Sequence, residues 1–151
     1  MLRDAKNDLF HLLNILESIG KIRKYTEDID SPEQFIDQKD QMIYNASLTL
    51  LANIGESIWK LSEYSTETLS GLDLNAIRGM RNRIVHDYSG LNSYIIFEVT
   101  KSGLNDLKKT IEKHIKESIL NHKFDEEEYE LSVASPYYRH IDFKLMENKK
   151  S

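Results

Sequence analysis

Apolar residues recur at intervals of three and four over most of this chain, and few residues interrupt the pattern. The 151 residues include only two prolines and six glycines. In an α-helix this spacing collects side chains on one face, whereas a half-buried strand needs strict alternation. Leu9, Leu12, Leu16, Ile19 and Ile22 form such a stripe near the N-terminus. The chain is therefore predicted to be all-α.

Helix boundaries are predicted from residues typical of helix ends. Ser31-Pro32-Glu33-Gln34 predicts a helix start, because Ser31 can cap, Pro32 suits the first turn and Gln34 completes a capping box. The predicted helices span about residues 4–27, 32–64, 72–86 and 93–122, with a turn over residues 66–71. Antiparallel helices with short connections form an up-down bundle.

The last part of the chain differs in character from the rest. A chain of 151 residues fits one domain, so residues 1–122 are predicted to form the bundle and residues 123–151 a C-terminal extension. Asp125 begins an acidic run, and residues 130–134 fit neither a helix nor a clean strand. Tyr137, Tyr138 and Phe143 favour packing of the extension on the bundle over a partly disordered arm.

Composition excludes several classes of protein. The chain has no cysteine, so it has no disulfide, thiolate nucleophile or cysteine zinc site. No apolar run approaches the length of a membrane span, and Met1-Leu2-Arg3-Asp4 does not resemble the start of a signal peptide. A cytoplasmic protein is expected. The net charge of −5 argues against coating of nucleic acid by a broad basic surface, but not against a local basic cleft.

The histidines outside the central motif carry little functional signal. His11 and His114 fall within predicted helices and are expected at a surface or an interface. His122 and His140 have no carboxylate or histidine at metal-ligand spacing on a shared face. No metal site and no cofactor are predicted.

Residues 78–88, in the third predicted helix and just beyond it, carry the densest chemistry. A fixed charge, an amide, an imidazole and a phenol occur within eight residues, from Arg81 to Tyr88. In a helix Arg81 falls inside the apolar arc of its neighbours, where a guanidinium is costly unless it is paired or lines a cleft. Asn82 and His86 are four residues apart and share a neighbouring face. Arg81 is therefore either paired or available for an anion.

This segment resembles the motif of the HEPN superfamily, and within it that of the HepT-like toxin ribonucleases. The motif consists of Arg81 and Asn82, three variable residues, His86, one further residue and Tyr88. Ile54-Gly55-Glu56-Ser57 is similar to an Ile-Gly-Glu-Ala element in the family's second long helix. With the helix order, the resemblance covers residues 4–116. Asp73-Leu74-Asn75-Ala76 departs from it, because the family commonly has a Pro-Trp pair ahead of the motif. The segment after residue 122 lies outside the resemblance.

The resemblance implies a metal-independent endoribonuclease that acts on RNA as a homodimer, with two motifs facing one cleft. Arg81, Asn82 and His86 are the catalytic residues that it implies. It also implies an antitoxin of the minimal nucleotidyltransferase (MNT) type, which adds AMP to Tyr88 and silences the toxin. A toxin–antitoxin pair is therefore the expected context.

These residue types suit RNA cleavage by the ribose 2′-OH. A histidine side chain has a reference pKa of about 6.5, so it can act as base or acid near neutrality. Arg81 supplies a permanent forked donor for phosphate oxygens, and Asn82 could orient His86 or bind phosphate directly. One His86 per protomer fills one role, so two in a dimer could divide base and acid. AMP on Tyr88 would add negative charge and bulk to an anion-binding cleft.

Structural roles for the same residues stay open. Arg81 could simply pair with Glu56 of the preceding helix, and Glu56 is also a candidate partner of Arg78. Gly55 is expected to mark close helix packing. Arg78 and Arg83 are possible supporting residues of the site.

A second function also stays open. His86 could interact with the helix macrodipole, and Tyr88 could be a core or dimer contact. In that case the domain is a non-catalytic interaction or nucleotide-binding module that docks a nucleotidyltransferase.

Overall fold

The structure is a computed structural model that describes residues 4–147, and over that range it contains helices and no strands. The predicted all-α class is confirmed. The α-helices are α1 (Asp8–Thr26), α2 (Pro32–Asp37), α3 (Met42–Trp59), α4 (Glu63–Thr68), α5 (Leu74–His86), α6 (Ser93–Glu98), α7 (Asn105–Leu120) and α8 (Glu126–Val133). Short 3-10 turns, η1 (Ala5–Asn7), η2 (Tyr88–Gly90) and η4 (Phe143–Met146), and a π-turn, η3 (Val99–Gly103), complete the elements.

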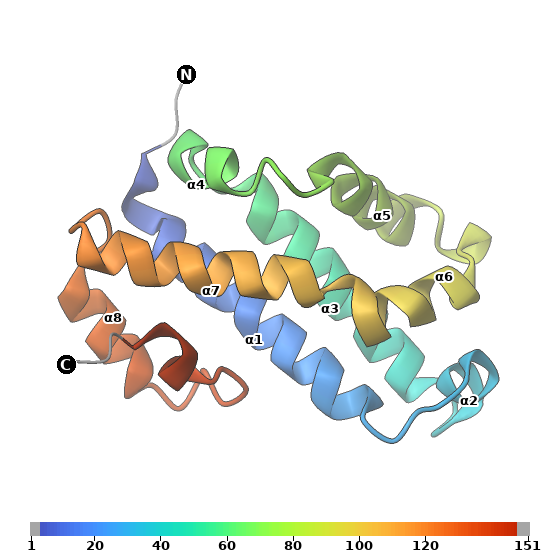
Figure 1. Cartoon of the computed structure of the whole chain (residues 1–151). Coiled ribbons are helices and arrows are strands. Elements are labelled where there is room, and N and C mark those ends of the chain that lie inside the picture. Colours follow the sequence, from blue (N-terminus) through green and yellow to red (C-terminus); the bar gives the residue numbers. More distant parts are fainter. Residues whose placement is uncertain (1–3, 148–151) are drawn as a thin grey trace.

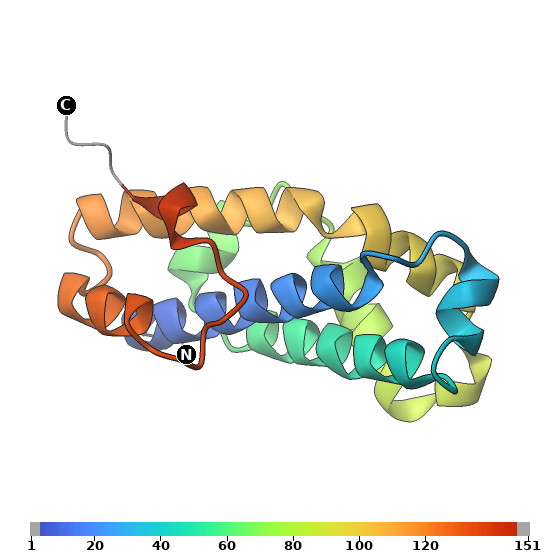
Figure 2. The ribbon, with the colours of Figure 1, turned by 90° about the horizontal axis from the view of Figure 1, so that it is seen from below.

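The long helices form the centre of the bundle. α1 and α3 lie side by side and antiparallel, α5 packs on α3, and α7 packs on α1 (Figures 1 and 2). Their apolar stripes meet in one core, in which Leu12, Ile54 and Ile111 are fully buried. Because α5 contacts the bundle mainly through α3, it lies at the margin of the molecule, with much of its surface exposed.

The prediction of one continuous helix over residues 32–64 is wrong, because the helix is interrupted twice in the structure. At the first break Lys39, Asp40 and Gln41 have φ angles of 54°, 53° and 67°. These lie in the left-handed region, which residues other than glycine seldom adopt. The backbone therefore reverses between α2 and α3. The predicted cap is confirmed, because the Gln34 N–H donates to Ser31 Oγ at 3.1 Å.

The second break separates α3 from α4 and is fixed by a buried carboxylate at the start of α1. Asp8 accepts the Ser62 backbone N–H at 2.9 Å, and its other oxygen accepts the Ser62 and Ser65 hydroxyls, each at 2.5 Å. Ser65 also lies 2.8 Å from Nε2 of His114 on α7. Since His114 is buried, its predicted surface position is wrong. These hydrogen bonds connect α4 to α1 and α7. The turn predicted over residues 66–71 is therefore helical in its first part, which belongs to α4.

The third predicted helix is confirmed as α5, and Asp73 caps it by accepting the Ala76 N–H at 3.0 Å. The fourth predicted helix begins after Asn92, which caps it by accepting the Tyr94 N–H at 3.0 Å. It is not continuous, because the π-turn η3, which ends at Gly103, separates α6 from α7.

The C-terminal extension contains a helix that the sequence analysis missed. Residues 130–134 were predicted to be irregular, yet α8 runs through most of them. Asp125 caps α8 by accepting the Glu127 N–H at 3.0 Å, and the acidic run lies in the first turn, where the helix dipole favours negative charge. Phe124, Tyr129 and Met146 are buried in the same core as the bundle. The domain division at residue 122 stays a prediction, and residues 148–151 lie outside the described range.

The extension docks on α1 through a glycine and a buried carboxylate. A Cβ on Gly20 would collide with the carbonyl oxygen of His140 and would lie 2.6 Å from its Cβ. Glu17 accepts the His140 backbone N–H at 2.7 Å, and its other oxygen lies 2.7 Å from the His140 ring nitrogen Nδ1. Only glycine therefore permits this approach, and the Glu17 carboxylate fixes it.

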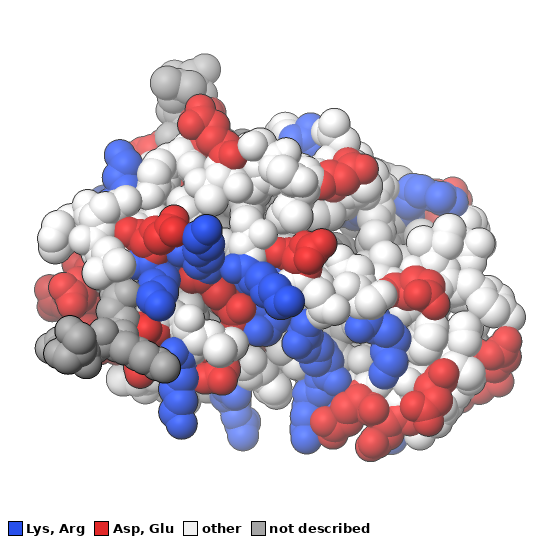
Figure 3. Space-filling model, in the orientation of Figure 1, with Lys and Arg blue, Asp and Glu red and all other residues white. Residues whose placement is uncertain are grey.

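Over the described range, no helix has the length and apolar character needed to cross a membrane. The prediction about a signal peptide rests on residues 1–3, which lie outside that range. On the face that carries α7, basic and acidic side chains are interspersed (Figure 3). That face is therefore not a broad basic surface.

Candidate active site

Arg81 lies where α5 approaches α3 most closely, and the approach depends on Gly55. A Cβ on Gly55 would lie 2.6 Å from Cβ of Arg81, much closer than side-chain carbons pack. The guanidinium then reaches Glu56, with Nη2 2.9 Å from the carboxylate oxygen Oε2. Both predicted roles, Gly55 in close packing and Glu56 as the partner of Arg81, are confirmed.

The Arg81–Glu56 pair is accessible to solvent. The Arg81 side chain is 31 % exposed and that of Glu56 is 42 % exposed. Arg81 also donates from Nη1 to Oδ1 of Asn82 at 3.0 Å. The guanidinium is thus held in place while part of it still faces water.

The pair forms one wall of a pocket of about 330 Å³. Its lining residues are Gly55, Glu56, Trp59, Arg78, Arg81 and Asn82. The Arg78 guanidinium lies over the Trp59 ring, 4.1 Å from the ring centroid. Arg78 is therefore stacked on Trp59, and the alternative pairing of Arg78 with Glu56 is not seen.

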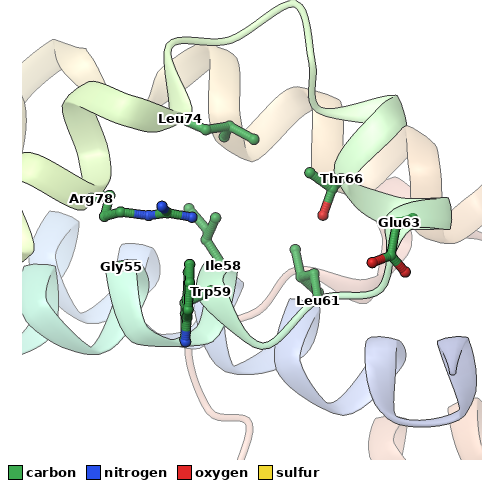
Figure 4. Close-up of a pocket in the computed structure, with 8 residues that line it drawn as sticks. All are labelled: Gly55, Ile58, Trp59, Leu61, Glu63, Thr66, Leu74 and Arg78. Atoms are coloured by element: carbon green, nitrogen blue, oxygen red, sulfur yellow. The ribbon is translucent and has the colours of Figure 1, made fainter. Parts of the chain in front are cut away.

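Beside this pocket lies a second one of about 280 Å³, drawn in Figure 4. Gly55, Trp59 and Arg78 line both pockets, so the two share a wall. Trp59 was missed by the sequence analysis. It stands four residues after Gly55, so helical spacing places it on the face that meets α5. That spacing could have identified it.

His86 is the last residue of α5 and is exposed. It stands four residues after Asn82, about 6 Å further along the helix axis, and it does not line the Arg81 pocket. Arg83 lies on the same stretch and donates from Nη2 to the Gly90 carbonyl at 2.8 Å. The fold thus brings Arg81 and Asn82 together at the pocket and leaves His86 about one turn beyond it, at the C-terminal end of α5 and open to solvent.

Tyr88 follows in the turn η2, and its side chain is 52 % exposed. Its hydroxyl donates to Oδ1 of Asn45 on α3 at 2.5 Å. Burial is the main cause that raises the pKa of the adjacent Tyr44, and the nearby Tyr88 raises it further. Asn45 was missed by the sequence analysis, because no pattern links it to a residue 43 positions away.

Within residues 4–147, no group of three or more histidine, aspartate or glutamate side chains is arranged to hold a metal ion.

The antiparallel helices, the pocket with Arg81 and Asn82, and the neighbouring His86 and Tyr88 together define a helical protein of the HEPN class. The family model described as "Ribonuclease HepT-like" matches residues 15–114. This protein therefore belongs to the HepT-like ribonuclease family.

Proteins of known sequence support that assignment. "Putative RNase MJ0125" of Methanocaldococcus jannaschii is 30% identical over 115 residues, which is 76% of this chain and 94% of that protein. "Putative RNase MJ1216" of the same organism is 30% identical over 115 residues, 76% of this chain and 90% of the relative. "Putative RNase TTE0752" of Caldanaerobacter subterraneus is 31% identical over 81 residues, 54% of this chain and 70% of the relative. No solved structure matches the chain.

Proposed function

We propose that this protein is a ribonuclease that cleaves RNA without a metal ion, using Arg81, Asn82 and His86. Membership of the HepT-like family supports this, as do the RNase names of its relatives. The observation that carries the proposal is the Arg81 guanidinium, which is held in a pocket by one partly exposed carboxylate. A phosphate group carries negatively charged oxygens, as that carboxylate does, and can replace it as the partner of the guanidinium.

The proposed reaction begins with attack of the ribose 2′-oxygen on the neighbouring phosphorus. The 2′-O–P bond forms, the P–O5′ bond breaks, and the 5′-oxygen takes up a proton. The products are a 2′,3′-cyclic phosphate and a 5′-hydroxyl end. Arg81 and Asn82 stabilise the charge of the phosphorane, and His86 transfers a proton.

A single His86 cannot both remove the 2′ proton and protonate the leaving group in one step. A homodimer formed through α5 would supply a second one, because twofold symmetry pairs each residue with its copy. Ile84 is the buried residue of α5, whereas Ala76, Gly79 and Val85 are exposed. Gly79 and His86 are seven residues apart and lie on one exposed face of α5, and the missing side chain at Gly79 would let a second helix approach closely there.

The position of Tyr88 supports a role in control by an MNT-family nucleotidyltransferase antitoxin. The side chain is exposed, lies two residues after His86, and is oriented by Asn45. In AMPylation the Tyr88 oxygen bonds to the α-phosphorus of ATP, pyrophosphate leaves, and the phenol proton is lost. The added phosphate would repel RNA from the site. The protein would then be the toxin of a toxin–antitoxin pair.

Cleavage of a mixed RNA in EDTA tests the catalytic proposal. We expect cleavage by the wild type, loss of cleavage with His86→Ala, and full activity with His122→Asn. His122 is an exposed histidine away from α5, and its φ of 61° is one that asparagine tolerates. No cleavage by the wild type would favour the alternative, a non-catalytic module that docks the nucleotidyltransferase. Equal cleavage by wild type and His86→Ala would contradict the assigned role of His86.

The regulatory proposal has its own test. Incubation with the cognate nucleotidyltransferase and ATP should add AMP to the wild type and not to Tyr88→Phe, as measured by mass spectrometry. AMP found on another residue would contradict it.

A further inference from the structure

The pocket in Figure 4 combines an aromatic wall, an arginine and a carboxylate. α3 supplies the aromatic wall with Trp59, α5 supplies Arg78, and α4 supplies Glu63. Arg78 reaches into the pocket from one end, and Glu63 lies toward the other (Figure 4). None of the catalytic residues assigned above lines it.

The walls suit a flat aromatic ring. Trp59 is 50 % exposed, and the Arg78 guanidinium lies over its ring, 4.1 Å from the ring centroid. Ile58, Leu61 and Leu74 supply apolar side chains around the same space. Nucleobases stack on aromatic side chains and on arginine guanidinium planes, and each such contact contributes substantially to binding of single-stranded RNA. The volume, about 280 Å³, is at the lower limit of small-molecule sites, which suits one base better than a larger ligand.

The polar groups at the two ends select among the bases. Guanine presents acceptors, O6 and N7, on one edge, and arginine is the usual partner of that pair. Its N1–H and N2–H₂ groups are donors, which a carboxylate such as Glu63 can accept. Adenine has no N1–H, and uracil and cytosine lack the N7 and O6 pair that Arg78 would bind.

The pocket also lies in the right place for a base next to the scissile phosphate. It shares Gly55, Trp59 and Arg78 with the Arg81 pocket, so a nucleotide can occupy both at once. We propose that this pocket binds a guanine base of the RNA substrate, which takes the place of the Arg78 guanidinium on the Trp59 ring. Arg78 then turns to donate to O6 and N7 of the base, and Glu63 accepts from its N1–H and N2–H₂ groups. The proposal rests on the proposed ribonuclease function for its substrate class.

The chain provides its own probe, because Trp59 is the single tryptophan of the sequence. Its fluorescence reports directly on a base bound in the pocket, with no need for catalysis. The full-length protein is titrated with 3′-GMP, 3′-AMP, 3′-CMP and 3′-UMP, and the midpoint of each titration is compared. We expect 3′-GMP to bind about tenfold or more tighter than the others, which is the discrimination that one bidentate base contact provides.

Two matched variants test the role of the carboxylate. Glu63→Gln should lose the preference for 3′-GMP, whereas Glu67→Gln should keep it. Glu67 lies one turn further along α4, is exposed and does not line the pocket. Sequencing of RNA ends should show cleavage beside guanine in the wild type and a relaxed pattern in Glu63→Gln.

The outcomes separate this inference from the proposed function. Tight 3′-GMP binding without RNA cleavage supports the base pocket and contradicts the ribonuclease. Cleavage without any change in Trp59 fluorescence supports the ribonuclease and overturns the base pocket. Equal midpoints for all four nucleotides, or an unchanged preference in Glu63→Gln, overturn the assignment of guanine.

Discussion

Replacement of Gly55 by alanine tests the contact that positions the site. In the native protein a Cβ at Gly55 would lie 2.6 Å from Cβ and 3.0 Å from Cγ of Arg81. The nearest atom is close to the backbone of α5 and cannot swing away as the end of a long side chain could. α5 must therefore shift away from α3, and Arg81 must shift with it.

The expected change in the free energy of unfolding for Gly55→Ala follows from two opposing effects. Alanine in place of glycine inside a helix stabilises by about 1 kcal/mol, because the unfolded glycine has more conformational freedom. Overpacking costs about 1–3 kcal/mol when neighbouring backbone has to move. The expected net effect of Gly55→Ala is a loss of about 0–2 kcal/mol in the free energy of unfolding.

Gly79→Ala is the matched control, since Gly79 lies inside α5 and a Cβ there meets no atom within 4 Å. This variant should be more stable than the wild type by about 1 kcal/mol, because alanine has the higher helix propensity and its Cβ meets no neighbouring atom. For a domain of this size that corresponds to a rise of about 2–4 °C in Tm. Thermal and urea unfolding measure both variants, and sedimentation checks that their association state is unchanged.

Activity supplies a second readout of the same shift. Because Arg81 would move with α5, Gly55→Ala should also reduce RNA cleavage while its association state stays that of the wild type. If Gly55→Ala is stabilised as much as Gly79→Ala and cleaves RNA as well as the wild type does, the close contact does not position Arg81 and the reasoning is wrong.

Three further predictions concern the rest of the molecule. Gly20→Ala should displace the C-terminal extension from α1, because the added Cβ collides with the His140 backbone. Amide hydrogen exchange over residues 135–147 should then be faster than in the wild type, and an unchanged rate would contradict this packing. Glu56→Gln should lower KM for RNA, because phosphate no longer competes with the carboxylate for Arg81. The free energy of unfolding should change by less than about 1 kcal/mol, since the ion pair is partly exposed. An unchanged or raised KM would refute this competition. Burial lowers the pKa of His114 below its ordinary value of 6.5, although Asp8 and Glu117 oppose the shift. The stability that this histidine contributes is therefore fully present above about pH 6.5 and is lost as the pH falls through its lower folded pKa. Urea unfolding between pH 7 and pH 5 should therefore show a loss of at most about 1.4 kcal/mol per pH unit from this group, and His114→Gln should remove that part of the slope; an identical slope in the variant would contradict it.

Local signals in the sequence predict the parts of the fold that local interactions determine. The cap residues Ser31, Asp73 and Asn92 each fix a helix start by a hydrogen bond to a backbone N–H within the next three residues. The Asp125 cap belongs to the same class and was available in the sequence. The acidic run after Asp125 hides this signal, because such a run fits a solvated surface as well as the first turn of a helix.

The breaks in the helices depend on distant residues, so local pattern could not predict them. Residues 39–41 contain neither glycine nor proline, yet their φ angles lie in the left-handed region, so no local residue type marks the break between α2 and α3. The break before α4 depends on Asp8, which lies 54 residues earlier than Ser62. His114 was misplaced for the same reason, because its partner Ser65 becomes visible only in the folded chain.

The same distinction applies to the site. The position of Arg81 on the apolar side of its helix predicted either a partner or an anion site, and in the structure Arg81 pairs with Glu56. Trp59 and Asn45 belong to α3 and acquire their significance only when α5 and its following turn pack beside them. The motif thus identifies the residues of α5, and the fold adds the residues that face them.

The most direct test of the proposed ribonuclease compares RNA with its 2′-O-methyl analogue in EDTA, with analysis of the product ends. The account predicts that the unmodified RNA is cleaved to 2′,3′-cyclic phosphate and 5′-hydroxyl ends, and that the 2′-O-methyl RNA stays intact because its 2′-oxygen cannot attack. Cleavage of the 2′-O-methyl RNA, or 5′-phosphate ends on the products, would contradict the mechanism assigned to Arg81 and His86.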